Sequence, residues 1–415
     1  MPANKPVVLG GTPTITDDHT AHCQWPLIEE DDLAAVTQVM QSGDISTHPV
    51  RMELETAYAN KFKRQYAVSH NNGTSALLAA FFACELGQGD EVLVTSATWW
   101  ASVSPMLWLG AVPVFCECET KRFGISVDDM NLKLTSKTRA IVVVHLWGMP
   151  SNMDEIQAFA DEHGLKIIED ASHAHGASLH GQPCGSFGDV SVFSLQGDKL
   201  SPAGEGGVLL TDNYDFYERT ICLGDVTRIY QLETPARRFA ATSFGVKTRM
   251  APLSAAVGLS QLNKLDKNNA RRNSNIEVIS KPLEEMGFDT YMGTDGYQRT
   301  YFEFLVKWTP ECGIGIDALV QAVNAEGAQV MAPRYPMLHQ QPFFVEGHWN
   351  SIARLENGLE EYDFSKVSLP VTQSESQLMI RLPSFSTASR DFLDQYIQAF
   401  RKVISNGTEI EKALG

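Results

Sequence analysis

Short runs of β-branched and apolar residues recur between Glu91 and Thr211, and each is followed by a stretch with helical periodicity. The runs that predict buried strands are Glu91–Thr95, Val112–Cys116, Ala140–His145, Lys166–Glu169, Val190–Ser194 and Gly207–Thr211. The stretches that predict helices are Glu29–Ser42, Met52–Phe62, Ser75–Leu86, Met153–His163 and Leu253–Asn273. Strands that alternate with helices predict an α/β fold in which helices cover both faces of a mostly parallel sheet.

The pattern changes from Ile276 onward. There the chain predicts, in order, a strand at Tyr301–Lys307, a helix at Ile316–Glu326 and a closing amphipathic helix at Ser389–Ile404. We therefore expect a large α/β domain with an N-terminal arm over residues 1–270 and a smaller α+β domain over residues 271–415. The loop Ala332–Trp349 is rich in proline and aromatic residues, a composition that fits both the lining of a substrate cleft and a simple packing loop.

The charge balance narrows the possible partners. The 415 residues include 33 Lys and Arg against 50 Asp and Glu, which gives a formal net charge of −17. An acidic surface without a basic cluster repels phosphate backbones, so we expect no nucleic-acid partner. The longest uncharged apolar run, Ala76–Cys84, is far shorter than the ~20 residues of a membrane span, and Met1–Asp18 lacks a signal-peptide pattern. These features predict a cytoplasmic protein without a membrane segment.

The seven cysteines are odd in number, widely spaced and mostly inside apolar segments. This pattern predicts buried thiols rather than a disulfide framework. Cys116 and Cys118 form the one close pair, and we expect their side chains to point in opposite directions. Because no second pair accompanies them, we expect no metal site.

A candidate phosphate site lies at the start of a predicted apolar helix. The segment Asn71-Asn72-Gly73-Thr74-Ser75 follows a strand-like run and opens that helix. Gly73 permits a tight turn, Thr74 and Ser75 supply hydroxyls, and the N–H groups of the first turn carry the positive end of the helix dipole. These features suit a phosphate group, although an ordinary helix cap has the same sequence.

An acidic strand end followed by two histidines is the second candidate. Ile167–Gly176 predicts a buried strand that ends in Glu169 and Asp170 and continues into a turn with His173 and His175. A carboxylate at the C-terminal end of a parallel strand lies at the edge of the sheet where ligands bind. Asp170 is therefore a candidate ligand contact, with a helix N-cap as the simpler alternative. The histidines lack a third clustered ligand, which argues against a metal.

A lysine in a loop of small residues is the third candidate. Lys199 follows the strand Val190–Ser194 and precedes the small-residue run Ser201–Gly207. A lysine between an apolar strand and closely packed backbone can have a lowered pKa and form a Schiff base, whereas an ordinary loop lysine is solvated. Taken together, the three segments describe a site for pyridoxal phosphate, a carbonyl cofactor that carries a phosphate.

The same segments resemble those of a known family. In chain order they are HNNGTSAL, TSATWWAS, IIEDASHAHGA, SVFSLQGDKLSPAGEGGVLLTD and FGVKTRMAPLSAAVGLSQL, with GGTP at Gly10–Pro13 and YPMLHQQPF at Tyr335–Phe343. From about Gly10 to Val403 the chain strongly resembles the DegT/DnrJ/StrS family of sugar aminotransferases. The resemblance implies a fold-type I pyridoxal phosphate enzyme with a large domain built on a seven-stranded type of sheet.

The resemblance also implies roles for single residues. It makes Lys199 the Schiff-base lysine and Asp170 the partner of the pyridine nitrogen, where a protonated ring acts as an electron sink. The other expected cofactor contacts are Gly73, Thr74, Ser75, Trp99, His173, Ser194 and Lys247. Trp100 and His339 are candidate substrate contacts.

Lys247 matches a residue that reaches the phosphate from the neighbouring subunit, which implies a homodimer with shared active sites. Simpler roles compete for three of these residues. Trp99 fits a core residue, Lys247 fits a surface cation, and His173 fits a partner of a backbone hydrogen bond.

The presence of Lys199 favours amino transfer, because relatives that dehydrate or deoxygenate their substrates have a histidine there. We expect a ping-pong reaction through pyridoxamine phosphate, in which L-glutamine or L-glutamate donates an amino group to a ketocyclitol or a nucleotide-linked ketosugar. Such a reaction belongs to secondary-metabolite or glycan biosynthesis.

Two features favour the cyclitol. The HAHGA turn and the Ser-Leu-Gln before the lysine loop resemble the branch of scyllo-inosose aminotransferases and aminohydroxybenzoate synthases, and no basic cluster suits a diphosphate. Trp99-Trp100 and Ala251-Pro252 depart from the usual pattern of the family. The alternative function is that of a dehydratase or lyase of the aminohydroxybenzoate synthase type, which uses the same lysine. A non-catalytic sensor would need an attached DNA-binding segment or a lost lysine, and the chain has neither.

Overall fold

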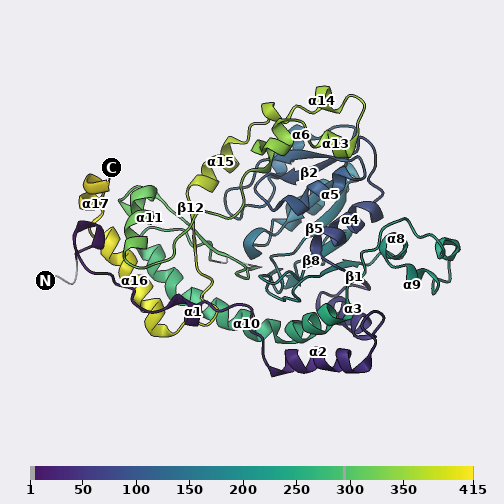
Figure 1. Ribbon diagram of the computed structural model, residues 1–415. Coiled ribbons are helices and arrows are strands. Elements are labelled where there is room, and N and C mark those ends of the chain that lie inside the picture. Colours follow the sequence, from purple (N-terminus) through teal and green to yellow (C-terminus); the bar gives the residue numbers. More distant parts are fainter. Residues whose placement is uncertain (1–4, 293–295, 415) are drawn as a thin grey trace.

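The computed structural model describes residues 5–292 and 296–414, with a twisted sheet in the larger of two lobes (Figure 1). Within these residues, a sheet of seven strands has the order β1-β9-β8-β5-β4-β2-β3. Its strands are β1 Tyr66–His70, β2 Glu91–Thr95, β3 Val112–Cys116, β4 Thr138–Val144, β5 Lys166–Asp170, β8 Val190–Ser194 and β9 Gly207–Thr211. All neighbouring pairs from β8 to β3 are parallel, which confirms the predicted mostly parallel α/β sheet.

The prediction of a helix after every strand is wrong in two places. Strand β5 is followed by the hairpin β6 Ser178–Leu179 and β7 Gln182–Pro183, to which β10 Tyr297–Gln298 adds a third strand. Strand β8 is followed by a loop over residues 195–206, and β9 then runs antiparallel to β8. So short a connection returns the chain to the adjacent position only in the opposite direction. The loop leaves Lys199 at the C-terminal edge of the parallel strands.

Helices cover both faces of the sheet, and β4 shows why. Ala140, Val142 and Val144 pack into the larger hydrophobic core, whereas Ile141 and Val143 pack into a separate core on the other face. Successive strand residues point to opposite faces, so a strand that is apolar at every position needs cover on both sides. The helices of this lobe are α2 Glu30–Ser42, α3 Val50–Lys61, α4 Gly73–Ala83, α5 Ser104–Leu107, α6 Val127–Lys133, α7 Met153–His163, α8 Tyr214–Gly224 and α9 Val226–Ile229.

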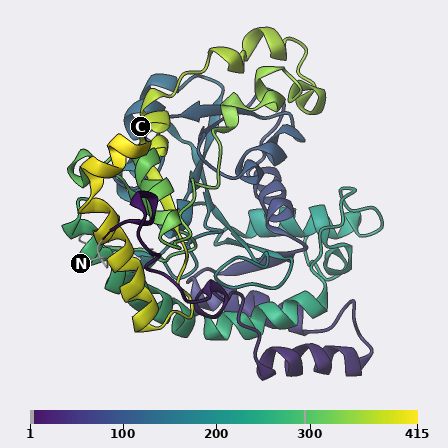
Figure 2. The same cartoon turned by 60° about the vertical axis from the view of Figure 1, so that its left-hand side comes forward.

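A long helix, α10 Pro252–Glu285, leads from the large lobe into the second lobe (Figures 1 and 2). The second lobe has its own core, which includes Ile276, Phe304 and Phe400, and the N-terminal arm packs there through Ile15. Its elements are α1 His19–His22, β11 Phe304–Lys307, α11 Ile316–Ala325, β12 Met379–Leu382, α16 Arg390–Ile404 and α17 Gly407–Leu414. The domain boundary at residue 270 falls inside α10 and stays a prediction.

The proline- and aromatic-rich loop returns to the large lobe. Tyr335, Met337, Phe344, Trp349 and Phe364 are buried in the same core as the sheet. This segment and its continuation contain α12 Pro342–Val345, α13 Asn350–Ala353, α14 Gly358–Glu361 and α15 Pro370–Gln377. As a result, a stretch distant in sequence lies against the C-terminal edge of the sheet, next to the lysine loop.

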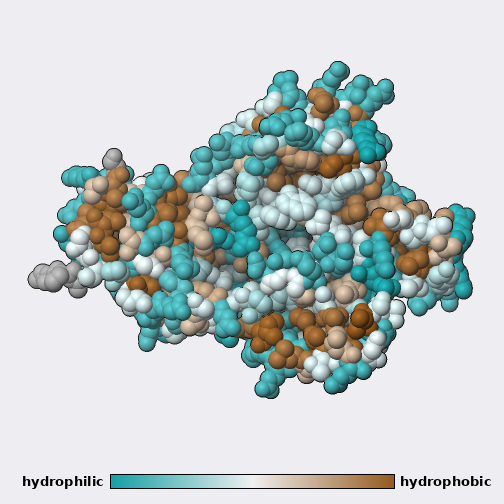
Figure 3. Space-filling view, in the orientation of Figure 1, coloured by the Kyte–Doolittle hydropathy of each residue, from teal (hydrophilic) through white to brown (hydrophobic). Residues whose placement is uncertain are grey.

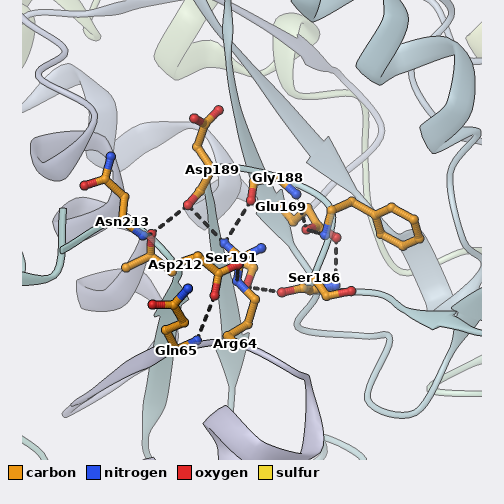
Figure 4. Close-up of polar contacts among 12 residues, drawn as sticks. Arg64, Gln65, Glu169, Ser186, Gly188, Asp189, Ser191, Asp212 and Asn213 are labelled. Atoms are coloured by element: carbon orange, nitrogen blue, oxygen red, sulfur yellow. Dashed lines mark hydrogen bonds and ion pairs between the residues drawn. The ribbon is translucent and has the colours of Figure 1, made fainter. Parts of the chain in front are cut away.

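Glu169 has a structural role on the opposite face of β5 from Asp170. Its carboxylate accepts the N–H groups of Gly185, Phe187 and Gly188, each at 2.7 Å, and Arg64 donates to the carbonyl oxygen of Gly188 at 2.9 Å (Figure 4). These bonds fix the turn that enters β8. The next residue, Asp170, points to the other face and is left for a ligand.

Two further predictions concern cysteines and membranes. All seven cysteines lie in the described part of the chain and are free; six are buried and Cys23 is half-buried. Cys116 and Cys118 pack into different cores, but not because of strand alternation, which would place residues two apart on one face. Strand β3 ends at Cys116, so Cys118 lies beyond it. Over residues 5–292 and 296–414, no helix has the length and apolar character to cross a membrane. The cytoplasmic location stays a prediction.

Candidate active site

A cavity of about 470 Å³ opens at the C-terminal edge of the parallel strands. Residues from the starts of helices, the ends of strands, the lysine loop and the returning segment line it. They are Asn72, Gly73, Thr74, Leu77, Trp99, Trp100, Ala101, Ser102, Asp170, Ser172, His173, Ser194, Gln196, Asp198, Lys199, Glu205, Arg334 and Tyr335. The three segments that the sequence singled out therefore meet in one place.

The start of α4 forms a backbone cradle at one end of the cavity. The side-chain oxygen of Asn72 accepts the N–H of Ser75 at 2.8 Å, and the N–H groups of Gly73 and Thr74 have no acceptor within their helix. A Cβ on Gly73 would lie 2.7 Å from the Cβ of Ser194, so only glycine fits there. The bare backbone at Gly73, the hydroxyls of Thr74 and Ser194, and the helix dipole suit a phosphate group.

Asp170 ends β5 on the floor of the cavity. The hydroxyl of Ser102 donates to its Oδ2 at 2.6 Å, and the N–H of Ser172 donates to its Oδ1 at 3.2 Å. These two donors orient the buried carboxylate and leave it lone pairs for a further donor. A protonated pyridine nitrogen is such a donor, and the carboxylate stabilises its charge.

The amine of Lys199 is buried against an aromatic ring. Its Nζ lies 4.2 Å from the ring centroid of Phe302. Burial lowers the pKa of Lys199 from 10.5 to about 8, with the carboxylate of Asp170 opposing the shift and the guanidinium of Arg334 adding to it. A pKa near 8 leaves roughly a tenth of the amines neutral at pH 7, and the neutral amine is the form that attacks a carbonyl group.

His173 lies between the floor of the cavity and the segment after residue 330 that returns to the large lobe. Its ring stacks on Phe302, with centroids 4.2 Å apart and an angle of 12° between the planes. Its Nδ1 accepts the N–H of Trp147 at 3.3 Å, and its Nε2 lies 3.2 Å from the hydroxyl of Tyr335. Burial and the charge of Lys199 lower the pKa of His173 well below its ordinary value. The ring is therefore neutral and carries its proton on Nε2, where it donates to Tyr335.

Two tryptophans form the outer wall. Trp99 and Trp100 have ring centroids 5.5 Å apart, and their exposed fractions are 45% and 44%. Trp99 also lies 6.0 Å from the ring of Tyr335. Trp99 is therefore not a core residue, and its half-exposed indole faces a cavity where a flat ring can stack.

Sequence reasoning assigned no role to several cavity residues, among them Ser102, Arg334 and Tyr335. Ser102 closes the run TSATWWAS, and Arg334 directly precedes the run YPMLHQQPF, so both stood beside recognised motifs. Arg334 is half-exposed and its Nε pairs with the buried carboxylate of Glu303 at 2.7 Å. Contact between Arg334 or Tyr335 and the strand ends depends on how the segment after residue 330 returns to the sheet, which no local pattern reveals.

Three predicted residues lie outside the cavity lining. The N–H of Ser75 bonds the cap, whereas its side chain does not line the cavity. His339 is buried and its Nδ1 lies 2.7 Å from the hydroxyl of Ser96. Lys247 is exposed on the segment that follows α9.

The residues that line the cavity fit pyridoxal phosphate. The cradle that a Cβ would fill suits the phosphate, the oriented carboxylate suits the ring nitrogen, and the buried amine suits the aldehyde. Each group stands on a different element, and all of them line one cavity.

Comparison with known proteins supports this interpretation. The model of the DegT/DnrJ/EryC1/StrS aminotransferase family matches residues 26–399. An L-glutamine:scyllo-inosose aminotransferase of Streptomyces griseus is 31% identical, over 94% of this chain and 96% of its own. An L-glutamine:2-deoxy-scyllo-inosose aminotransferase of Streptomyces kanamyceticus is 29% identical, over 92% and 93%. The solved structure of the aminotransferase from Psychrobacter cryohalolentis has a TM-score of 0.82 and 27% identity, over 93% of this chain and 99% of that one.

Proposed function

Because the chain belongs to the DegT/DnrJ/EryC1/StrS aminotransferase family, we propose that it transfers the amino group of L-glutamine to the ketone of a cyclitol. The chain is a pyridoxal phosphate-dependent aminotransferase of fold type I. The observation that carries the proposal is the burial of Lys199 in the same cavity as Asp170 and the cradle at Gly73. We place the reaction in aminocyclitol biosynthesis, because the two relatives above are named for scyllo-inosose substrates.

Pyridoxal phosphate supplies, when bound, an aldehyde that combines with amines and a ring that takes up electron density. Gly73, Thr74 and Ser194 would hold its phosphate, and Trp99 would cover the ring. Asp170 would hold a proton at the pyridine nitrogen, since its carboxylate is oriented by Ser102 and is shielded from water. A buried carboxylate stabilises that positive charge far more than an exposed one does.

Lys199 is the proton-transfer group of the proposal. Its Nζ has a pKa close to a working pH near neutrality, which suits a general base that must also act as an acid. Nζ would take the proton from the substrate carbon that bears the amino group. In the second half-reaction, in which the ketone is the substrate, Nζ would move a proton in the reverse direction, onto the substrate carbon, as a ping-pong reaction requires.

The charge of the cavity lining supports a neutral acceptor. Lys199 and Arg334 are the two basic side chains among the lining residues, and Arg334 is paired with Glu303. Gln196, Asp198 and Glu205 add hydroxyl-binding and acidic groups instead. A polyhydroxylated ring finds hydrogen-bond partners there, whereas the diphosphate of a nucleotide sugar would meet carboxylates without a basic cluster.

The competing function is that of a dehydratase of the aminohydroxybenzoate synthase type, and the comparisons favour aminotransferase. The test is to incubate the holoenzyme with L-glutamine and scyllo-inosose and to analyse the products by mass spectrometry. We expect an aminocyclitol together with the 2-oxo acid of glutamine. Loss of water from the ring without transfer of nitrogen would refute the proposal.

We also propose that the active form is a homodimer in which Lys247 serves the partner's cavity. Lys247 is exposed and does not line its own cavity, yet its neighbour Thr248 is tied to the cradle. The carbonyl oxygen of Thr248 accepts the N–H of Asn71 at 2.5 Å, and its hydroxyl lies 2.9 Å from Nδ1 of His70. The backbone beside Lys247 is thereby anchored, while Lys247 itself is exposed.

Exposed apolar residues mark the surface that the partner would cover. Helix α2 and its flanks expose Ile28, Leu33, Met40 and Ile45, with Leu33 62% exposed. In Figure 3 brown side chains gather over the part of the molecule where Figure 1 shows α2. Apolar side chains of this size gather on a surface when another chain covers it.

Mixed dimers test the shared site. We expect that a 1:1 mixture of Lys199→Ala and Lys247→Ala chains, unfolded and refolded together, regains roughly a quarter of wild-type activity, because half of the dimers then hold one intact site. Each variant refolded alone is the control and should stay inactive or impaired. Absence of recovery in mixtures that demonstrably exchange chains would contradict the shared site.

A further inference from the structure

The N-terminal arm reaches the loop that carries the buried lysine. The indole N–H of Trp25 donates to the backbone carbonyl oxygen of Lys199 at 3.0 Å, across 174 residues of sequence. Among the described residues, no other hydrogen bond to that oxygen is found. The backbone N–H of Lys199 donates to the carbonyl oxygen of Gln196 at 2.8 Å, within the loop itself. Trp25 therefore provides the long-range polar contact of the lysine backbone.

The backbone on either side of Trp25 is fixed. Before it, the N–H of Gln24 donates to the hydroxyl of Thr387, in the second lobe, at 3.2 Å. After it, the side-chain amide of Gln261, on helix α10, donates to the carbonyl oxygen of Leu27 at 2.9 Å. These two bonds anchor the arm to both neighbours, so the indole starts from a backbone with little freedom to move.

Arg272 holds the indole ring from its face. This residue lies on α10 and is 3% exposed, and the central carbon of its guanidinium lies 4.2 Å from the ring centroid of Trp25. Its Nη2 donates to the hydroxyl of Ser386, in the second lobe, at 3.0 Å. A guanidinium is attracted to the face of a tryptophan ring, and the attraction is stronger where water is excluded. Arg272 therefore favours one orientation of the indole.

We propose that Trp25 is a positioning residue for Lys199. The indole N–H fixes the backbone of the lysine, and Arg272 keeps the indole in the orientation that this bond needs, so that Nζ stays at one place in the cavity. The inference rests on the role proposed above for Lys199. Trp25 is not among the described residues that line the cavity, so it acts through the lysine rather than on a ligand.

A fixed backbone matters here because the lysine side chain is long and flexible. Four methylene groups separate Nζ from the backbone, and each of their bonds can rotate. A displacement of ~1 Å between reacting groups can lower a rate by roughly 100-fold. An anchor at the carbonyl oxygen of Lys199 limits one source of such displacement.

The first test is covalent capture of pyridoxal phosphate by the full-length apoenzyme, followed by stopped-flow absorbance from pH 6 to 10. Trp25→Phe keeps a ring for Arg272 and removes the N–H donor. We expect capture at pH 7 to slow about fivefold, the effect of one lost hydrogen bond. The rate should also level off at a higher pH than in the wild type, because a looser loop buries Nζ less and burial lowers the pKa of Lys199.

The matched control is Trp108→Phe. The indole of Trp108 is 69% exposed, and the residue does not line the cavity described above. We expect this variant to capture the cofactor at the wild-type rate and with the wild-type pH profile.

Hydrogen–deuterium exchange of the apoenzyme provides a second measurement, which does not depend on the cofactor. In Trp25→Phe we expect the amides of the loop over residues 195–206 to exchange about fivefold faster, because the loop opens more often. Amides of the central strands should exchange at the wild-type rate.

Arg272→Lys tests the support of the indole. It removes the planar guanidinium from the ring face, so we expect slower capture and faster loop exchange, although Arg272 does not contact Lys199. If this variant fails to fold, Ser386→Ala replaces it, since it removes only the hydroxyl that Nη2 contacts. We then expect capture to slow about twofold.

Two results would overturn the proposal, and they are distinguishable. A Trp25→Phe protein with a lowered melting temperature but with wild-type capture, pH profile and loop exchange would show that Trp25 only stabilises the arm. Covalent capture by Lys199→Ala would instead refute the role of Lys199 and this inference with it.

Discussion

The buried amine of Lys199 makes a quantitative prediction about how fast the apoenzyme captures pyridoxal phosphate. With a pKa of about 8, roughly a tenth of the lysines are neutral at pH 7, against about one in 3,000 for a lysine at its ordinary value of 10.5. Since only the neutral amine attacks, the capture rate at pH 7 should exceed that of a free lysine by roughly 300-fold on this ground alone. The rate should rise about tenfold per pH unit below pH 8 and level off above it.

Two variants check the direction in which neighbouring charges move the pKa of Lys199. Asp170→Asn removes the carboxylate that opposes the effect of burial, so the plateau should begin at a lower pH than in the wild type. Arg334→Gln removes a cation that helps to lower the pKa, so the plateau should begin at a higher pH.

Stopped-flow absorbance after mixing apoenzyme with the cofactor at pH 6 to 10 measures these rates. Nα-acetyl-lysine over the same pH range corrects for the titration of the cofactor itself, and Lys199→Ala should show no covalent capture. A corrected rate that keeps rising up to pH 10 would show that Lys199 is an ordinary solvated lysine and would refute the reasoning.

Three further predictions follow from the cavity. Asp170→Asn should retain cofactor but slow proton abstraction from L-glutamine by about 10²- to 10³-fold, because the ring nitrogen loses its stabilising charge; near-normal rates in single-turnover absorbance would identify another carboxylate. Gly73→Ala should weaken cofactor binding at least tenfold in equilibrium dialysis, since the new Cβ meets Ser194 at 2.7 Å, whereas Gly197→Ala has 4.0 Å of room and serves as the control. Arg334→Gln should raise the KM for L-glutamine about tenfold with a smaller effect on kcat, because the half-exposed guanidinium is the cation that can meet the donor's carboxylate; an unchanged KM in steady-state kinetics would contradict that role.

The sheet was predictable because its strands are short and apolar on both faces. Such runs at Ala140–His145 and Val190–Ser194 have few alternatives to a buried parallel strand. The two places without a crossover helix were not predictable, because the residues after β5 and β8 are rich in glycine and small side chains that serve the ligand site. The end of α10 was placed too early, at Asn273 rather than Glu285, because the helix becomes polar as it leaves the large lobe.

The site residues likewise fall into those that the local sequence reveals and those that depend on long-range packing. Gly73, Asp170, Ser194 and Lys199 each follow or end a strand, so the topology of a parallel sheet brings them to one edge and local sequence reveals them. Arg334 belongs to a segment whose position depends on burying side chains such as Trp349 in a core far away in sequence. That packing is long-range, and a single sequence holds no periodic signal for it.

The most direct test of the account is the visible absorption spectrum of the holoenzyme before and after addition of L-glutamine, without any ketone. The account predicts that the band of the lysine-bound cofactor gives way to the absorption of pyridoxamine phosphate, and that scyllo-inosose then restores the original band. A holoenzyme whose band changes with neither L-glutamine nor L-glutamate would contradict amino transfer from these donors, and a protein that forms no band with added pyridoxal phosphate would contradict the site itself.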